Sequence, residues 1–239
     1  MNTQRLRLFP LNTVLFPGAA LHLHVFEPRY KQMISECLDE GEAFGVCLIR
    51  EGDEAEDPDV DPHEVGTTAE IGDVMPLPFG RFYISTVGKR RFRIARVISR
   101  EPYLLCEVSY LDEAPSDDPD VVETLNGQVR DEFHEYLRLL VEYSGTRVDV
   151  DLPHDPEGAS FVVGNALQVA EAIKQRLLEI DDAGGRLRVE LDFLRRLLPQ
   201  LRSLLERKRT SPARERDDPP GGEARSQQER YFGRSFSRN

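Results

Sequence analysis

The sequence predicts an α+β protein in which a β-rich first part precedes a helical second part. Short apolar runs separated by turn residues extend to about residue 115, and helical periodicity begins at about residue 116. The length of 239 residues allows one large domain or two small ones. The predicted divisions are 1–115 for the β-rich part, 116–208 for the helical part and 209–239 for a basic tail.

Seven short apolar runs in the first part are expected to form strands. Several alternate apolar and polar residues, as in 91–97, so that one face can be buried while the other contacts water. Turn signals separate the runs, and Gly88–Arg90 is one of them. Many short strands at this spacing are typical of a small barrel or sandwich. The expected strands are Leu6–Phe9, His22–Phe26, Ala43–Ile49, Thr67–Met75, Phe82–Val87, Phe92–Ile98 and Leu104–Tyr110.

One helix is predicted to interrupt these strands. Pro28 occupies a first-turn position, and Gly41 is placed to end the helix. The apolar side chains between them share one face, which we expect to be buried. These side chains are Tyr30, Met33, Ile34, Cys37 and Leu38.

Three helical stretches are predicted in the second part. The first begins at Ser116–Pro119, where an Asp cap precedes a proline, and ends at Ser144–Gly145. The second covers 157–179. The third carries a leucine seam that can pack against helices of the same chain or against a second copy. Pro199 lies within the seam and is expected to kink or split that helix. The seam consists of Leu187, Leu191, Leu194, Leu198, Leu201 and Leu205.

The charge distribution separates the tail from the rest of the chain. Nine basic and five acidic residues lie in 207–239, which gives this segment +4 and the remaining residues −16. Its Pro, Gly, Ser and Arg content predicts disorder, and a basic tail can fold back, contact an anionic partner or stay solvated. The acidic body disfavours nucleic-acid binding because it repels phosphates.

No metal, cofactor or membrane segment is expected. No apolar run approaches the length of a membrane span, and the first residues lack a signal region, so we expect a cytoplasmic protein. Cys37, Cys47 and Cys106 show no CxxC spacing and are expected to be buried thiols in a reducing compartment. The Asp residues in 57–61 suggest a calcium loop, but Pro62 replaces the Gly that such a loop requires. A solvated acidic loop is the better interpretation.

Signatures of catalysis are absent from the sequence. The phosphate-binding motif G-x-x-x-x-G-K-[ST], the zinc motif H-E-x-x-H and the hydrolase motif G-x-S-x-G do not occur. His22 and His24 would share a strand face, but a third metal ligand is not recognisable, so packing or surface roles are favoured. These motifs therefore give no indication of an enzyme, although a triad assembled from distant positions stays open.

A series of motifs resembles the N-terminal substrate-binding domain of Lon proteases. The order and spacing of the blocks match over about 5–206, and the block Phe26–Tyr30, which reads FEPRY, is the most specific. The resemblance implies a PUA-like β-barrel, with one inserted helix, followed by a C-terminal helical bundle. The matching blocks are Leu8–Leu11, Val14–Gly18, Leu23–Tyr30, Phe44–Val46, Val65–Ile71, Gly88–Ile94, Lys174–Glu179 and Arg186–Leu187.

The resemblance implies recognition of polypeptides rather than their cleavage. The ATPase and Ser–Lys peptidase modules of full-length Lon have no counterpart here, so we expect a non-enzymatic module that binds exposed apolar segments of unfolded or misfolded proteins. Its partners would include such polypeptides and, in an adaptor role, an ATP-dependent protease; a chaperone-like role is the alternative. We expect an apolar cleft between barrel and bundle, and a monomer or weak dimer.

The candidate peptide-binding residues are Phe79, Arg81 and Tyr83. Where the family often has an Asp-Gly-Arg turn, this chain has Phe79-Gly80-Arg81. A phenylalanine at a hairpin tip is costly to leave in water and can contact an apolar peptide, or it can fold back onto its own barrel. Among the shared motifs, Tyr30 is expected to pack under the barrel, and Arg29 to pair with a carboxylate.

Two other functions stay open at this point. PUA-like barrels in other families bind RNA, and the arginines of 89–96 are the best local support for that function. Strand alternation, however, would expose these arginines as an ordinary solvated face. An enzyme of unrecognised type would need convergent side chains with displaced pKa values.

Overall fold

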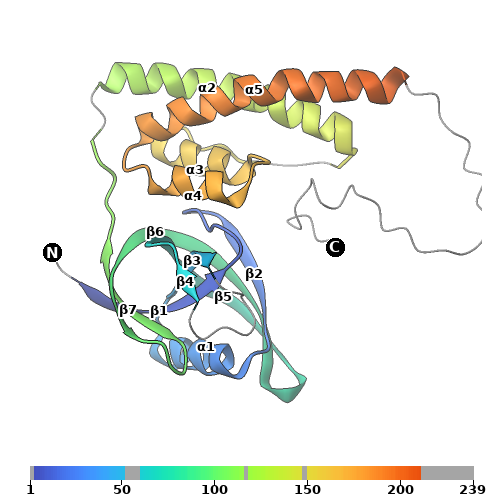
Figure 1. Ribbon diagram of the computed structural model, residues 1–239. Helices are drawn as coiled ribbons and strands as arrows, with labels where there is room; N and C mark the ends of the chain where they lie inside the picture. The colour runs from blue at the N-terminus through green and yellow to red at the C-terminus, as the bar shows by residue number, and fades with distance from the viewer. Residues whose placement is uncertain (1–2, 52–59, 116–117, 147–149, 211–239) are drawn as a thin grey trace, which may run out of the picture.

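The computed structural model describes residues 3–51, 60–115, 118–146 and 150–210 (Figure 1). A barrel built from strands lies at one end, and four helices lie over it. The strands are β1 Gln4–Leu11, β2 Ala20–Val25, β3 Phe44–Glu51, β4 Asp61–Pro62, β5 Val65–Leu77, β6 Arg81–Ser99 and β7 Leu104–Tyr110, and the helices are α1 Pro28–Glu40, α2 Pro119–Ser144, α3 Pro156–Ala166, α4 Glu171–Glu179 and α5 Ala183–Thr210.

Five strands form a ring. Their order is β1-β7-β6-β5-β3, and β3 pairs in parallel with β1, which returns the ring to its start. The other four pairings in the ring are antiparallel. The short strand β4, which the sequence analysis missed, pairs with the end of β3. The expected α+β fold, with a barrel followed by helices, is confirmed.

The predicted division of the longest strand is wrong. β6 runs without interruption from Arg81 to Ser99, where two strands with a turn at Gly88–Arg90 were expected. A Cβ atom on Gly88 would lie 2.2 Å from the carbonyl oxygen of Phe16. The glycine therefore permits a close approach of two backbone segments and does not make a turn.

Helix α1 covers one end of the barrel, as the sequence predicted. Tyr30 is buried and its ring stacks on that of Phe9, with the centroids 3.9 Å apart. Gly41 ends the helix in the left-handed conformation, with φ of 67°. Leu38 is the exception on the predicted apolar face, because it is exposed. Arg29 pairs with Glu27, with 2.9 Å between Nε and Oε2.

The helical part differs from its prediction in two places. The stretch 157–179 contains two helices, α3 and α4, and the turn between them donates the Gln168 N–H to the hydroxyl of Tyr136 in α2. Helix α5 continues through Pro199 without splitting. The start at Asp118, whose side chain accepts from the N–H of Asp120, and the end at Gly145 are confirmed.

The leucine seam of α5 is used inside the chain. All six seam leucines are buried in a core that α2, α3 and α4 complete. Four side chains from the barrel part, Val14, Phe16, Leu48 and Val65, belong to the same core. The two parts therefore share apolar packing on one side, and the expected boundary at residue 115 stays a prediction; it falls between β7 and α2.

Two sequence predictions lie largely outside the described residues. One is the acidic loop, because residues 52–59 are not described. The other is the tail, of which only residues 209–210 are described, and these belong to α5. Within the described ranges, no cluster of three or more metal-ligating side chains occurs. No helix in those ranges combines the length and the apolarity that crossing a bilayer requires.

Candidate functional site

A three-stranded arm extends from the ring of strands. Residues 82–87 of β6 pair with β2 on one side, and residues 81–87 pair with the end of β5 on the other. The short 3-10 helix η1, Pro78–Gly80, joins β5 to β6 at the tip of the arm, which projects away from the helices in Figure 1. The predicted residues Phe79, Arg81 and Tyr83 all lie on this arm, so the fold brings them together.

Exposed apolar side chains form a row across the arm. Met75, Tyr83 and His24 are direct cross-strand partners on β5, β6 and β2, and therefore share one face. The rings of His24 and Tyr83 stack with their centroids 4.7 Å apart, and the ring centroid of Phe26 lies 5.5 Å from that of His24. Met75 is 56% exposed, Tyr83 47% and Phe26 54%. These four residues are named the apolar row.

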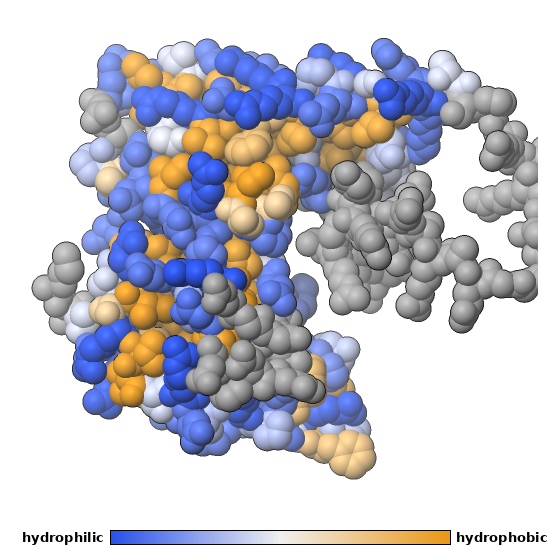
Figure 2. Space-filling view, viewed as in Figure 1, coloured by the Kyte–Doolittle hydropathy of each residue, from blue (hydrophilic) through white to orange (hydrophobic). Residues whose placement is uncertain are grey.

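Phe79 stands at the tip of the arm in an unfavourable conformation. Its side chain is 88% exposed, so the alternative in which it folds back onto the barrel is wrong. Its φ is 66°, a region that favours glycine and asparagine over bulky residues. The guanidinium carbon of Arg81 lies 5.9 Å from the centre of its ring. Figure 2 shows apolar surface at this end of the arm.

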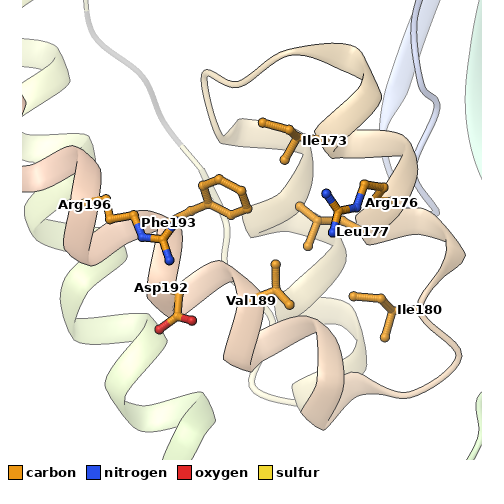
Figure 3. A pocket seen from close by; sticks show the side chains of 8 residues that line it. All are labelled: Ile173, Arg176, Leu177, Ile180, Val189, Asp192, Phe193 and Arg196. Atoms are coloured by element: carbon orange, nitrogen blue, oxygen red, sulfur yellow. The ribbon is translucent and has the colours of Figure 1, made fainter.

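A separate groove lies between α4 and α5 (Figure 3). Its volume is about 330 Å³, and its walls are apolar side chains such as Ile173 from α4 and Phe193 from α5. Arg176, Asp192 and Arg196 stand around it. This groove could not be predicted from the sequence, because the positions of Val189 and Phe193 beside the leucine seam give no indication of which helix they will face.

Beside the shared apolar core, one part of the junction between barrel and bundle is filled by polar side chains. The expected apolar cleft is wrong for that part. Arg91 of β6 is 3% exposed, although strand alternation predicted a solvated side chain. It donates to the carbonyl oxygen of Leu178 in α4, at 2.9 Å, and to that of Ile180, which follows α4, at 2.5 Å. Its other terminal nitrogen donates to Glu113 at 3.1 Å.

The three cysteines offer no nucleophile. All are free and buried, as predicted. Burial raises the pKa of Cys37 and of Cys106 to about 11 and raises that of Cys47 further, so each stays a protonated thiol near neutral pH. The residue types that gather at the arm are aromatic and apolar, which suits contact with other apolar groups rather than bond chemistry.

A closed ring of five strands that shares an apolar core with the helices, together with an exposed aromatic arm, defines the structural class of this chain. The chain belongs to the family described as the ATP-dependent protease La (LON) substrate-binding domain, whose model matches residues 5–196. The family and the fold that the sequence motifs implied are thereby confirmed.

Relatives and solved structures agree with this assignment. A Lon protease 2 of Myxococcus xanthus is 26% identical over 81% of this chain and 24% of its own length, and a Lon protease of Flavobacterium johnsoniae is 30% identical over 67% and 18%. The chain thus spans about a quarter or less of these relatives. A Lon N-terminal domain protein from Xanthomonas campestris superposes with a TM-score of 0.56 at 29% identity, covering 79% of this chain and 98% of its own. The N-terminal domain of a Mycobacterium avium complex Lon protease gives 0.59 at 19%, covering 80% and 98%.

Proposed function

We propose that this chain is a non-enzymatic recognition module that binds exposed apolar segments of unfolded or misfolded polypeptides through its arm. The observation that carries the proposal is Phe79, which is exposed and held at a positive φ. The exposed ring gains no burial on folding and the positive φ costs stability. Residues that break a local rule without a structural gain are typical of functional sites. The substrate-binding description of the family supports the same interpretation.

The surrounding side chains support apolar capture. The apolar row adds three exposed apolar side chains and a histidine to the surface near Phe79, and aromatic residues and methionine are enriched at binding surfaces. In the cell, the module would hold such clients in a chaperone-like manner or deliver them, as an adaptor, to an ATP-dependent protease. The free thiols fit a reducing compartment, so the proposal places the protein in the cytoplasm.

The test is binding of a fluorescently labelled, reduced and carboxamidomethylated lactalbumin, measured by anisotropy. Phe79→Asn removes the ring but suits the backbone conformation, and we expect it to weaken binding about tenfold, as is usual for loss of one central aromatic contact. Leu204→Gln removes an exposed apolar side chain of α5 and is the matched control. Unchanged binding by the Phe79 variant would refute the role of the arm.

RNA binding is the competing function, and the salt dependence of binding distinguishes it from the capture of apolar segments. Binding to phosphates weakens steeply between 50 and 200 mM salt, whereas apolar contacts do not. The burial of Arg91 removes one of the arginines that supported RNA binding. Tighter binding of single-stranded RNA than of unfolded lactalbumin would overturn the proposal.

A further inference from the structure

Strand β2 has one edge that the described chain leaves open. It pairs with β6, and no second strand within the described ranges pairs with its other edge. The N–H of Gly88 donates to the carbonyl of Ala19 at 2.9 Å, which fixes the direction of the backbone groups along β2. Because antiparallel pairs alternate, Leu21, Leu23 and Val25 then bond to β6. The backbone groups of Ala20, His22 and His24 point away from it.

This edge lacks the features that normally protect an exposed strand. Natural edges carry lysines, prolines, bulges or inward charges that prevent pairing with another chain. The β2 sequence, Ala-Leu-His-Leu-His-Val, contains neither lysine nor proline, and its register with β6 is regular over all six residues. Three N–H and C=O pairs, two residues apart along the strand, are therefore presented in the spacing of an extended chain.

We propose that a client segment binds as an additional antiparallel or parallel strand on the free edge of β2, an inference that rests on the proposed function. The occupant must be extended, because the groups that receive it have strand geometry. The apolar row supplies side-chain selectivity. A residue of the added strand opposite His24 extends the row Met75–Tyr83–His24 by one position and lies near Phe26.

The preferred client follows from this geometry. Alternate side chains of a strand share a face, so apolar residues must recur at every second position to contact the apolar row. A segment whose apolar residues recur every three or four positions would place only some of them on that face. We expect a heptapeptide with alternate apolar residues to bind at least tenfold more tightly than a peptide of the same composition in helical spacing.

Backbone methylation separates strand addition from capture by side chains alone. Methylating the alternate amides along one edge of the heptapeptide removes the donors that face β2, and methylating the other set leaves them intact. We expect methylation of the amides that face β2 to reduce affinity about tenfold or more, because three backbone hydrogen bonds are lost. Methylation of the other amides should have little effect. Equal affinity of all three peptides, with lactalbumin still bound, overturns the inference and leaves the proposed function standing.

A protein variant gives the matching test. His22→Pro removes an outward N–H without removing a bond to β6, and proline is tolerated at such edge positions. Its control, His22→Ala, keeps the N–H. We expect the proline variant to lose heptapeptide binding and the alanine variant to keep it, with thermal unfolding reporting that both fold. If sedimentation shows a dimer that His22→Pro dissociates while peptide affinity is unchanged, the edge pairs with a second copy and the inference is overturned.

Discussion

The guanidinium of Arg186 donates to the carboxylate of Glu113 at 2.6 Å, joining α5 to the segment between β7 and α2. The same carboxylate accepts from Arg91 of β6, and both guanidinium groups lie over the ring of Phe161. Burial, and then the charge of Arg186, lower the pKa of Arg91, whereas Glu113 raises it. Glu113 thus forms ion pairs with both buried cations, while the carboxylates of Asp181 and Glu157 act on Arg91 only through longer-range charge.

Replacing Glu113 with alanine is expected to destabilise the protein strongly. Removing one partner of a buried ion pair leaves an uncompensated charge, which costs about 3–5 kcal/mol. Urea denaturation should therefore show a large decrease in the free energy of unfolding. The neighbouring pair supplies the control, because Asp112 binds Arg90 at 3.2 Å on the exposed surface. Asp112→Asn should leave the midpoint nearly unchanged, and equal effects of the two variants would contradict this account.

Because Glu190 is buried, the free energy of unfolding of the protein is expected to decrease as pH rises. Its carboxyl group is fully buried in α5, and neither oxygen has a hydrogen-bond partner among the described residues. Burial raises the pKa of Glu190 well above the usual 4.5, with Arg186 opposing the shift. Above pH 4.5 the unfolded chain releases this proton while the folded chain keeps it, so folding is progressively opposed until the folded pKa is reached.

The variant Glu190→Gln should remove this pH dependence and be more stable than the parent protein at neutral pH, because the amide cannot ionise and its volume is similar. Urea denaturation of both proteins between pH 5 and 8 measures the two slopes. Parallel slopes would show that Glu190 does not contribute to the pH dependence.

Phe79 is expected to cost the folded state stability. Asparagine tolerates positive φ better than bulky residues, so Phe79→Asn should raise the free energy of unfolding by about 0.5–1 kcal/mol. Phe79→Val should lower it, because a β-branched residue is least suited to this region. Thermal unfolding distinguishes the two directions. A lower melting temperature for the asparagine variant would indicate that the ring contributes packing that outweighs its backbone cost.

Pro199 is expected to weaken the helix that contains it. Proline in a helix interior lacks one hydrogen bond and clashes with the preceding turn, at a cost of about 3 kcal/mol relative to alanine. Pro199 is exposed, so Pro199→Ala removes little packing. We expect a higher melting temperature by calorimetry. The exposed position Gln200→Ala is the control, and a loss of stability in the Pro199 variant would contradict the expectation.

The strands and caps could be predicted because their signals are local. Asp118 and Gly145 mark the ends of α2 through their own backbone bonds, and alternation marks most strands. The turn predicted at Gly88 is wrong, because the reason for a glycine there is the close approach of the Phe16 backbone, 72 positions earlier. Arg91 was misread for a similar reason, since the pattern of its strand does not reveal that the segment after α4 covers it.

The candidate site was partly accessible from the sequence. A phenylalanine at the tip of a hairpin is a local anomaly, so Phe79 and its neighbours Arg81 and Tyr83 could be selected. Met75 and Phe26 could not, because their proximity to Tyr83 and His24 depends on the pairing of three strands. The groove between α4 and α5 depends on the angle at which the two helices meet, and the spacing of apolar residues in the sequence does not indicate that angle.

The position of Arg91 has a consequence for chimeric proteins. A barrel grafted at residue 115 onto the helices of a relative would carry Arg91 and Glu113 together. The relative would have to supply the carbonyl oxygens that Leu178 and Ile180 present to Arg91, and a cation in the place of Arg186. Recombination within this family should therefore succeed when Arg91 keeps its carbonyl and carboxylate partners. Crossovers that separate Arg91 from these partners should give protein that aggregates on expression.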